Sequence, residues 1–151
     1  MRPVTVGIVG CGQISAAYLE GRTGMLSGLT RVVACSDLIA GRAQQRAAEF
    51  GIPKVCTTED LVADPEIEIV VNLTMPAQHH EVTMAALGAG KHVFSEKPLT
   101  VNRQLGKEIT DTAARNNLLL AGAPDTFLGT GLQVCRQLID DGAIGVPITA
   151  Q

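Results

Sequence analysis

Residues 4–15 have the sequence VTVGIVGCGQIS, and this stretch decides the fold. Its first half, residues 4–9, is a short apolar run rich in β-branched residues, which is typical of a strand buried on both faces. Glycines at positions 10 and 12 end this run, and a helix is expected to begin directly after Gly12. The stretch therefore predicts a strand, a tight turn and a helix in immediate succession.

The same succession of strand and helix recurs along the rest of the chain. Short apolar runs predict further strands at residues 31–36, 54–56, 68–73, 91–94 and 118–121. Apolar residues at helical spacing predict helices within residues 43–50, 59–63, 76–90, 101–116 and 132–139. The helix over 59–63 is expected to be capped by Thr57 or Thr58, and residues 146–150 are expected to be extended again.

Strands that alternate with helices indicate parallel strands joined by right-handed crossovers. The predicted fold class is therefore α/β: a doubly wound, mainly parallel sheet with helices on both faces, known as the Rossmann fold. The chain has 151 residues, the length of one domain, and 46% of them are hydrophobic, so a normal buried core is expected.

Charge and composition argue against several classes of partner. The net charge is -3 and only 3% of the residues are aromatic, whereas nucleic-acid binding requires a basic surface or aromatic platforms. The apolar run at residues 4–9 is too short for a membrane span or for the core of a signal peptide. We therefore expect no nucleic-acid partner, no membrane partner and a cytoplasmic location.

The cysteines and histidines do not have the spacing of a metal site. Two adjacent histidines, His79 and His80, would point about 100° apart on a helix and would not chelate one ion together. The four cysteines are widely spaced and form no C-x-x-C motif: Cys11, Cys35, Cys56 and Cys135. The sequence predicts buried, reduced thiols and no metal site.

The two glycines after the first strand indicate a site for a dinucleotide. Gly10 permits a tight turn, and Gly12 has no Cβ, so a diphosphate can approach the backbone closely. The loop also opens a helix, whose N-terminal N–H groups and dipole attract anions. Ser15 stands where the full fingerprint has a third glycine. The residues expected to bind the diphosphate are Gly10, Gly12, Gln13 and Ile14.

The second predicted strand ends at Ser36 and Asp37, which are both expected to bind the cofactor. Asp37 lies 25 residues after Gly12, and the glycine-rich residues 21–28 can absorb the excess over the usual spacing of about 20. A carboxylate here would accept hydrogen bonds from the adenosine ribose and repel a 2′-phosphate, so NAD(H) is expected rather than NADP(H). Arg42 could soften that preference, and Asp37 could instead be only a helix cap.

Glu96-Lys97-Pro98 follows the fifth predicted strand, at the edge where ligands of open α/β sheets bind. Together with residues 10–14 and 74–79, this triplet resembles the signature of the glucose-fructose oxidoreductase, inositol dehydrogenase and rhizopine catabolism family, Gfo/Idh/MocA. The similarity continues to residues 138–145, which are similar to the family's passage into its second domain.

The resemblance implies how the chain is divided. Residues 1–145 would form the N-terminal dinucleotide-binding domain, and residues 146–151 would begin a C-terminal substrate domain that the sequence otherwise lacks. In the family that second domain often makes the oligomer and supplies an aspartate and a histidine to the active site. The 151-residue chain alone is therefore expected to bind cofactor but to turn over little substrate.

The resemblance also assigns roles to the triplet. Lys97 would be the catalytic residue that contacts the substrate and the nicotinamide ribose and assists proton transfer, and Glu96 would position the lysine or that ribose. A lysine can stabilise developing alkoxide charge while hydride moves, provided that it is buried beside the reacting centre. The bond between Lys97 and Pro98 is expected to be cis. Lys97 could instead be a solvated loop residue.

In the family, the segment after the fourth strand lines the cofactor cleft. The matching residues of this chain are Asn72, Leu73, Thr74, Pro76 and His79. His79 could equally be a helix residue with its hydrogen bonds satisfied inside the protein. Pro124 and its neighbours, residues 123–127, depart from the pattern of many relatives at this strand end, so their role in substrate binding is left open.

Three functions are compatible with these residues. The first is an oxidoreductase that transfers hydride between a nicotinamide cofactor and a polyol, sugar or related secondary alcohol. The second is a non-catalytic dinucleotide-binding or sensor module, which would need the glycine loop and Asp37 but not Lys97. The third is an NAD-dependent glycosidase of the same family. The presence of Lys97 favours the oxidoreductase over the binding or sensor module, and the glycosidase stays open.

Overall fold

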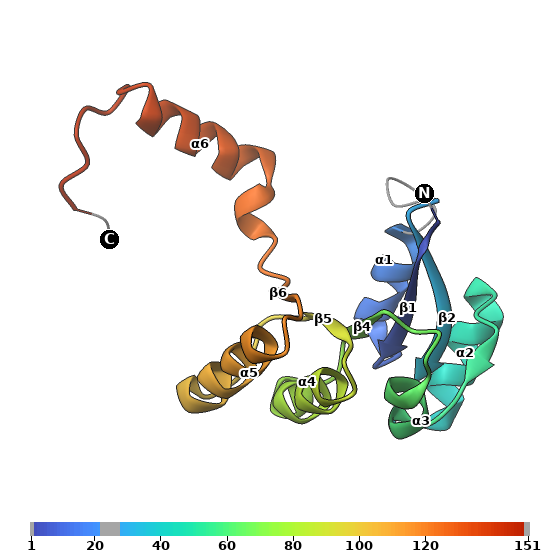
Figure 1. Cartoon of the computed structure of the whole chain (residues 1–151). Coiled ribbons are helices and arrows are strands. Elements are labelled where there is room, and N and C mark those ends of the chain that lie inside the picture. Colours follow the sequence, from blue (N-terminus) through green and yellow to red (C-terminus); the bar gives the residue numbers. More distant parts are fainter. Residues whose placement is uncertain (1, 22–27, 150–151) are drawn as a thin grey trace.

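The computed structural model describes residues 2–21 and 28–149 (Figure 1). Most of the glycine-rich stretch expected to lengthen the first crossover, residues 22–27, lies outside the described residues. So do residues 150 and 151, at the end of the segment expected to begin a second domain.

Within residues 2–21 and 28–149 the sheet has six strands in the order β3-β2-β1-β4-β5-β6, and every neighbouring pair is parallel. The strands are β1 (Val4–Val9), β2 (Thr30–Ser36), β3 (Lys54–Val55), β4 (Ile69–Asn72), β5 (His92–Ser95) and β6 (Leu120–Gly122). The reversal of order at β1 and β4 is the feature that defines a doubly wound sheet. The predicted fold class is confirmed.

Among the described residues, six α-helices connect and follow the strands: α1 (Gln13–Gly21), α2 (Ala40–Phe50), α3 (Thr58–Ala63), α4 (His79–Gly88), α5 (Arg103–Arg115) and α6 (Thr130–Asp140). Two short 3-10 turns, η1 (Pro76–Gln78) and η2 (Thr126–Leu128), precede α4 and α6. Of the two threonines expected to cap α3, Thr57 is the cap, because its side chain accepts a hydrogen bond from the Asp60 N–H at 3.1 Å. Such a cap satisfies one of the helix's otherwise unpaired N–H groups.

Two hydrophobic cores lie on opposite faces of the sheet, because successive residues of a strand point to opposite faces. Val9 of β1 packs in the core that α3, α4 and α5 cover with Leu61, Leu87 and Ile109. Ile8, the preceding residue, packs in the core that α1 and α2 cover with Leu19 and Ala43. Burying each large aliphatic side chain contributes about 1.5–3 kcal/mol. The two cores confirm the expectation of helices on both faces.

Helix α5 begins two residues later than its apolar spacing predicts. The side chain of Asn102 accepts hydrogen bonds from the N–H groups of Gln104 and Leu105, at 2.7 and 3.3 Å. Asn102 is therefore the N-cap, and the helix begins at the next residue, Arg103. Val101 therefore lies outside the helix and is 65% exposed. A side chain that caps the backbone overrides the apolar spacing at this position.

Helix α6 forms where predicted, but its apolar face is not buried. It extends away from the sheet beyond β6 (Figure 1), and Leu132, Leu138 and Ile139 are all exposed. No strand forms over the described residues 146–149, where extended structure was expected.

The cysteines are free thiols, as expected, but only Cys11 and Cys35 are buried. Cys56 is half-buried, and Cys135 is exposed because α6 packs against no core. Within residues 2–21 and 28–149, no three ligand side chains come together as a metal site would require. None of the described helices combines the length and apolar character needed to cross a bilayer.

Candidate functional site

The predicted site residues meet at the carboxyl edge of the sheet, where β2, β1, β4 and β5 end side by side. Backbone hydrogen bonds extend the sheet into the loops that follow. The Gly10 N–H donates to the Ser36 carbonyl at 2.8 Å, and the Glu96 N–H donates to the Asn72 carbonyl at 2.8 Å. The glycine loop is thereby fixed to the end of β2, and the Glu96 loop to the end of β4.

Gly10 is required by both its backbone angle and its surroundings. Its φ is +100°, and an added Cβ would lie 2.5 Å from the carbonyl carbon of Leu73. The glycine loop therefore packs directly on the backbone that follows β4. Gly12 is different, because a Cβ there would meet no atom within 4 Å. No described protein atom excludes a side chain from Gly12, so the open space is available to a ligand.

Asp37 joins the end of β2 to the glycine loop. Its Oδ2 accepts a hydrogen bond from the Cys11 N–H at 2.8 Å, and its Oδ1 accepts one from the Ile39 N–H at 2.8 Å. The N-cap of α2 is Ile39, so Asp37 is not itself the cap, although it does bind the residue that is. Each carboxylate oxygen can accept a further hydrogen bond, which leaves capacity for ribose hydroxyls.

The Cys11 thiol lies behind the loop. Its Sγ donates to the Ser36 carbonyl at 3.5 Å. A hydrogen bond with Cys35 and burial raise the pKa of the Cys11 thiol, and the negative charge of Asp37 raises it further. The thiol therefore stays protonated at neutral pH and places no negative charge beside an incoming diphosphate.

Ser15, in the place of the third glycine, is fully buried. Its Oγ donates to the Gly12 carbonyl at 2.6 Å and accepts a hydrogen bond from Nε of Arg46 at 3.1 Å. No pattern in the sequence points to Arg46, because it lies 31 positions after Ser15 on another helix. Gln13 and Ile14, the first residues of α1, are exposed at the mouth of the loop.

Asn72 shapes the turn after β4 from inside the protein. It is fully buried, and its Nδ2 donates to the carbonyl of His79 at 3.0 Å and to Thr83 Oγ1 at 3.2 Å. Its Oδ1 accepts from the Thr74 hydroxyl at 2.7 Å. Leu73 is also buried, whereas Thr74 and Pro76 are partly exposed. Of the predicted residues in this segment, Thr74 and Pro76 are therefore the ones that a ligand can reach, and Met75 between them is exposed as well.

His79 is also fully buried. Its Nδ1 lies 2.6 Å from the Pro98 carbonyl and its Nε2 lies 3.0 Å from the Thr74 carbonyl. The ring therefore connects the turn after β4 to the loop after β5. Of the two interpretations open from the sequence, the geometry is that of a helix residue with its hydrogen bonds satisfied inside the protein.

Tyr18 of α1 holds the Glu96 side chain, a contact that the sequence did not reveal. The Tyr18 hydroxyl donates to Glu96 Oε1 at 2.9 Å, and the Lys97 N–H donates to Oε2 at 2.7 Å. Burial raises the pKa of the Tyr18 hydroxyl, and the hydrogen bond with Glu96 raises it further, so the hydroxyl remains a donor. The ring also contacts Phe94 edge-on, with centroids 6.2 Å apart. The helix that opens at the glycine loop thus also positions the loop after β5.

Lys97 lies at the same edge, and its peptide bond to Pro98 is cis, as expected. Its side chain is exposed. The described residues therefore do not provide the burial that proton transfer by a lysine requires.

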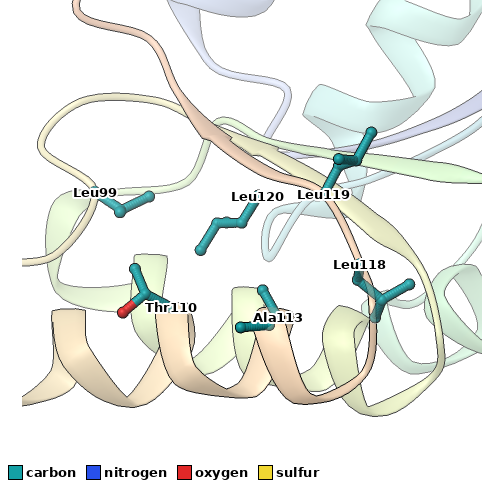
Figure 2. A pocket seen from close by; sticks show the side chains of 7 residues that line it. Leu99, Thr110, Ala113, Leu118, Leu119 and Leu120 are labelled. Atoms are coloured by element: carbon teal, nitrogen blue, oxygen red, sulfur yellow. The ribbon is translucent and has the colours of Figure 1, made fainter.

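An apolar hollow of about 330 Å³ lies elsewhere, between α5 and the start of β6 (Figure 2). Its lining consists of Leu99, Thr110, Ala113, Ala114, Leu118, Leu119 and Leu120. None of the predicted site residues lines it, so it is separate from the candidate dinucleotide site.

Comparison with known proteins assigns the family. Residues 4–122 match the family described as "Oxidoreductase family, NAD-binding Rossmann fold", Gfo/Idh/MocA. An inositol 2-dehydrogenase/D-chiro-inositol 3-dehydrogenase of Lactiplantibacillus plantarum is 33% identical over 147 residues, which are 95% of this chain and 41% of that protein.

Solved structures of other proteins share the fold. Biliverdin reductase from Synechocystis sp. PCC 6803, in complex with biliverdin and NADP+, superposes with a TM-score of 0.84 at 31% identity, over 92% of this chain and 43% of that one. A myo-inositol 2-dehydrogenase from Lactobacillus plantarum superposes with a TM-score of 0.87 at 21% identity, over 95% of this chain and 43% of that one. The chain spans less than half the length of these relatives. It belongs to the Gfo/Idh/MocA oxidoreductase family and contains that family's NAD-binding Rossmann fold.

Proposed function

We propose that this chain binds NAD(H), in preference to NADP(H), as the dinucleotide-binding part of an oxidoreductase that acts on a polyol, sugar or related secondary alcohol. The observation that carries the proposal is the open space at Gly12, next to a loop whose Cys11 N–H is held by the Asp37 carboxylate. A diphosphate fits where a Cβ would meet nothing, and a ribose fits beside the carboxylate.

Different residues would bind the different parts of the cofactor. The backbone from Gly10 to Ile14 would bind the diphosphate, and Asp37 would face the adenosine ribose. Ser36 would support Asp37 from inside, because it is buried and its hydroxyl lies 3.1 Å from Thr58 Oγ1. Thr74, Pro76 and Glu96 would lie along the nicotinamide half, while Asn72, Leu73 and His79 support them from inside. When bound, the nicotinamide ring supplies the site that accepts or donates hydride.

Lys97 is the proposed catalytic residue. Its ammonium group would donate a hydrogen bond to the substrate oxygen and stabilise negative charge there, while the hydroxyl proton would pass to a base of the substrate domain such as the histidine that the family resemblance implies. The hydrogen bond between its backbone N–H and Glu96 fixes the start of the side chain at the sheet edge. A binding or sensor module would need no lysine at this position. A glycosidase of the same family is the remaining alternative, since it would use the same dinucleotide site.

The NAD preference rests on the end of β2. The residues that follow Asp37 are Leu38 and Ile39, which are both apolar and exposed, and Arg42 comes later, in the first turn of α2. A 2′-phosphate beside the Asp37 carboxylate would meet like charge without an adjacent cation in the sequence to offset it. The biliverdin reductase structure contains NADP+, so the family fold by itself does not decide between the two cofactors.

The test is a titration of the chain with NADH and with NADPH, monitored by the fluorescence of the reduced nicotinamide. We expect NADH to bind at least about tenfold more tightly, which is a difference of about 1.4 kcal/mol. Equal affinities would overturn the NAD assignment. If neither NADH nor NADPH binds, the proposed function as a whole is overturned.

A further inference from the structure

Arg46 of α2 reaches the glycine loop from the side of the second crossover. Its side chain is only 17% exposed, although arginine is usually at the surface. Its Nε donates to the buried Ser15 Oγ at 3.1 Å, and its Nη2 lies 3.5 Å from the Gly12 carbonyl. Two different groups of one guanidinium thus converge on the loop that the proposed function uses.

Three donors meet at the Gly12 carbonyl oxygen. They are the Ser15 hydroxyl at 2.6 Å, the Ser15 N–H at 3.3 Å and Nη2 of Arg46 at 3.5 Å. In a trans peptide the carbonyl and the following N–H point in opposite directions. Holding the Gly12 carbonyl on the Arg46 side therefore turns the Gln13 N–H to the other side. This N–H belongs to the first turn of α1, where no partner exists within the helix.

We propose that Arg46 is a positioning residue for dinucleotide binding, which acts through Ser15 to fix the Gly12–Gln13 peptide so that the Gln13 N–H faces the diphosphate. This inference rests on the proposed function. It also accounts for the serine at the third glycine position, because a glycine there would offer no hydroxyl for Arg46 to hold.

Geometry rather than charge is the basis of the effect. Nη1 of Arg46 forms an ion pair with Glu49 at 2.5 Å, so part of the charge is already balanced within α2. A lysine at position 46 would keep the charge but would not reproduce the flat, forked set of donors. The two possible roles therefore predict different results for Arg46→Lys.

The experiment measures NADH affinity for the wild-type chain, Arg46→Lys, Arg46→Gln and Ser15→Ala. The matched control is Arg136→Gln, which removes an ion-paired arginine from α6, away from the glycine loop (Figure 1). We expect all three loop variants to weaken NADH binding by about five- to tenfold, as for loss of one ordinary hydrogen bond, and the control to bind normally. Ser15→Ala removes the hydroxyl that Arg46 contacts without changing any charge. It therefore still tests the proposal if an Arg46 variant folds poorly.

A second readout separates positioning from general loss of structure. The amide resonance of Gln13 is followed by NMR while inorganic pyrophosphate is added to each folded variant. We expect a clear shift in the wild type and a much smaller one in Arg46→Lys, with the amides of β1 unchanged.

Full NADH affinity in Arg46→Lys, or an unchanged Gln13 response, would overturn the positioning role while leaving the proposed function standing. If the wild-type chain itself fails to bind NADH, the proposed function fails and this inference fails with it.

Discussion

Oδ2 of Asp37 accepts a hydrogen bond from the backbone N–H of Cys11 at 2.8 Å, so the residue that follows β2 also holds the loop that follows β1. The carboxylate has two separable properties, its negative charge and its position as a hydrogen-bond acceptor. The first bears on the choice between NAD and NADP, and the second on the shape of the diphosphate loop.

Asp37→Asn and Asp37→Ala separate these properties. The carboxamide oxygen of asparagine can still accept from Cys11, but the charge is gone. We expect Asp37→Asn to keep most of its NADH affinity and to bind NADPH better, while Asp37→Ala loses about tenfold in NADH affinity and less in NADPH affinity, because the charge that repels the 2′-phosphate is also gone. Titrations with both cofactors measure this. Asp111→Asn on α5 is the control, and a full NADH preference in Asp37→Asn would contradict the expectation.

Alanine at Gly10 should lower the stability of the protein, whereas alanine at Gly12 should lower its affinity for NADH. Gly10→Ala forces a Cβ at φ +100° to within 2.5 Å of the Leu73 backbone, so we expect the free energy of unfolding to fall by about 3 kcal/mol or more. Gly12→Ala meets no protein atom, so the unfolding free energy should stay within about 1 kcal/mol of wild type. Its Cβ would occupy the diphosphate space, and NADH affinity should drop by at least about tenfold.

Urea denaturation and NADH titration measure the two effects separately. The result that would count against the site is a Gly12→Ala variant that is stable and binds NADH as tightly as wild type does.

Tyr18→Phe removes the donor to Glu96 and keeps the ring that contacts Phe94. We expect NADH to bind about fivefold more weakly, corresponding to about 1 kcal/mol, because Glu96 loses one of its two anchors at the nicotinamide end. ADP-ribose, which has no nicotinamide, serves as the matched ligand and should bind unchanged. An equal loss for the two ligands would mean that Tyr18 acts on the fold in general rather than on the Glu96 loop.

Glu68 gives a prediction for acid stability. Hydrogen bonds from the Thr5 N–H and hydroxyl, and then from Arg2, lower the pKa of Glu68 below its ordinary value of 4.5. Below pH 4.5 the unfolded chain therefore binds more protons than the native protein does at this group. The stabilisation is complete above that pH and is lost as the pH falls through the lowered native value.

We expect the free energy of unfolding of the wild type to fall more steeply between about pH 5 and pH 3 than that of Glu68→Gln, as measured by urea denaturation. Part of the fall should persist in the variant, because the pKa values of Asp64 and Glu66 are also lowered, by Lys54 and by further hydrogen bonds. Identical slopes for the two proteins would contradict the assignment to Glu68.

Local patterns along the sequence determined most of the fold. The apolar runs, the helical spacings and the glycine loop predicted the strands and α-helices of the described residues. One error lay at an element end, Val101, where the Asn102 cap decided the boundary, and others concerned burial, since the apolar face of α6 is exposed. The position of the glycine loop and Asp37 at the ends of neighbouring strands could also be predicted, because turn chemistry and the sequence order of strand, loop and helix are local properties.

The supporting half of the site was decided by the tertiary structure alone. Tyr18 and Glu96 are 78 positions apart in the sequence, and Arg46 and Ser15 are 31 positions apart. No periodic pattern in the sequence indicates either contact. His79 was found in the sequence, but only packing showed that its ring is buried between two loops. Elements form from interactions between near neighbours, whereas a site forms where the ends of separate elements are brought together, and that depends on how the whole sheet is ordered.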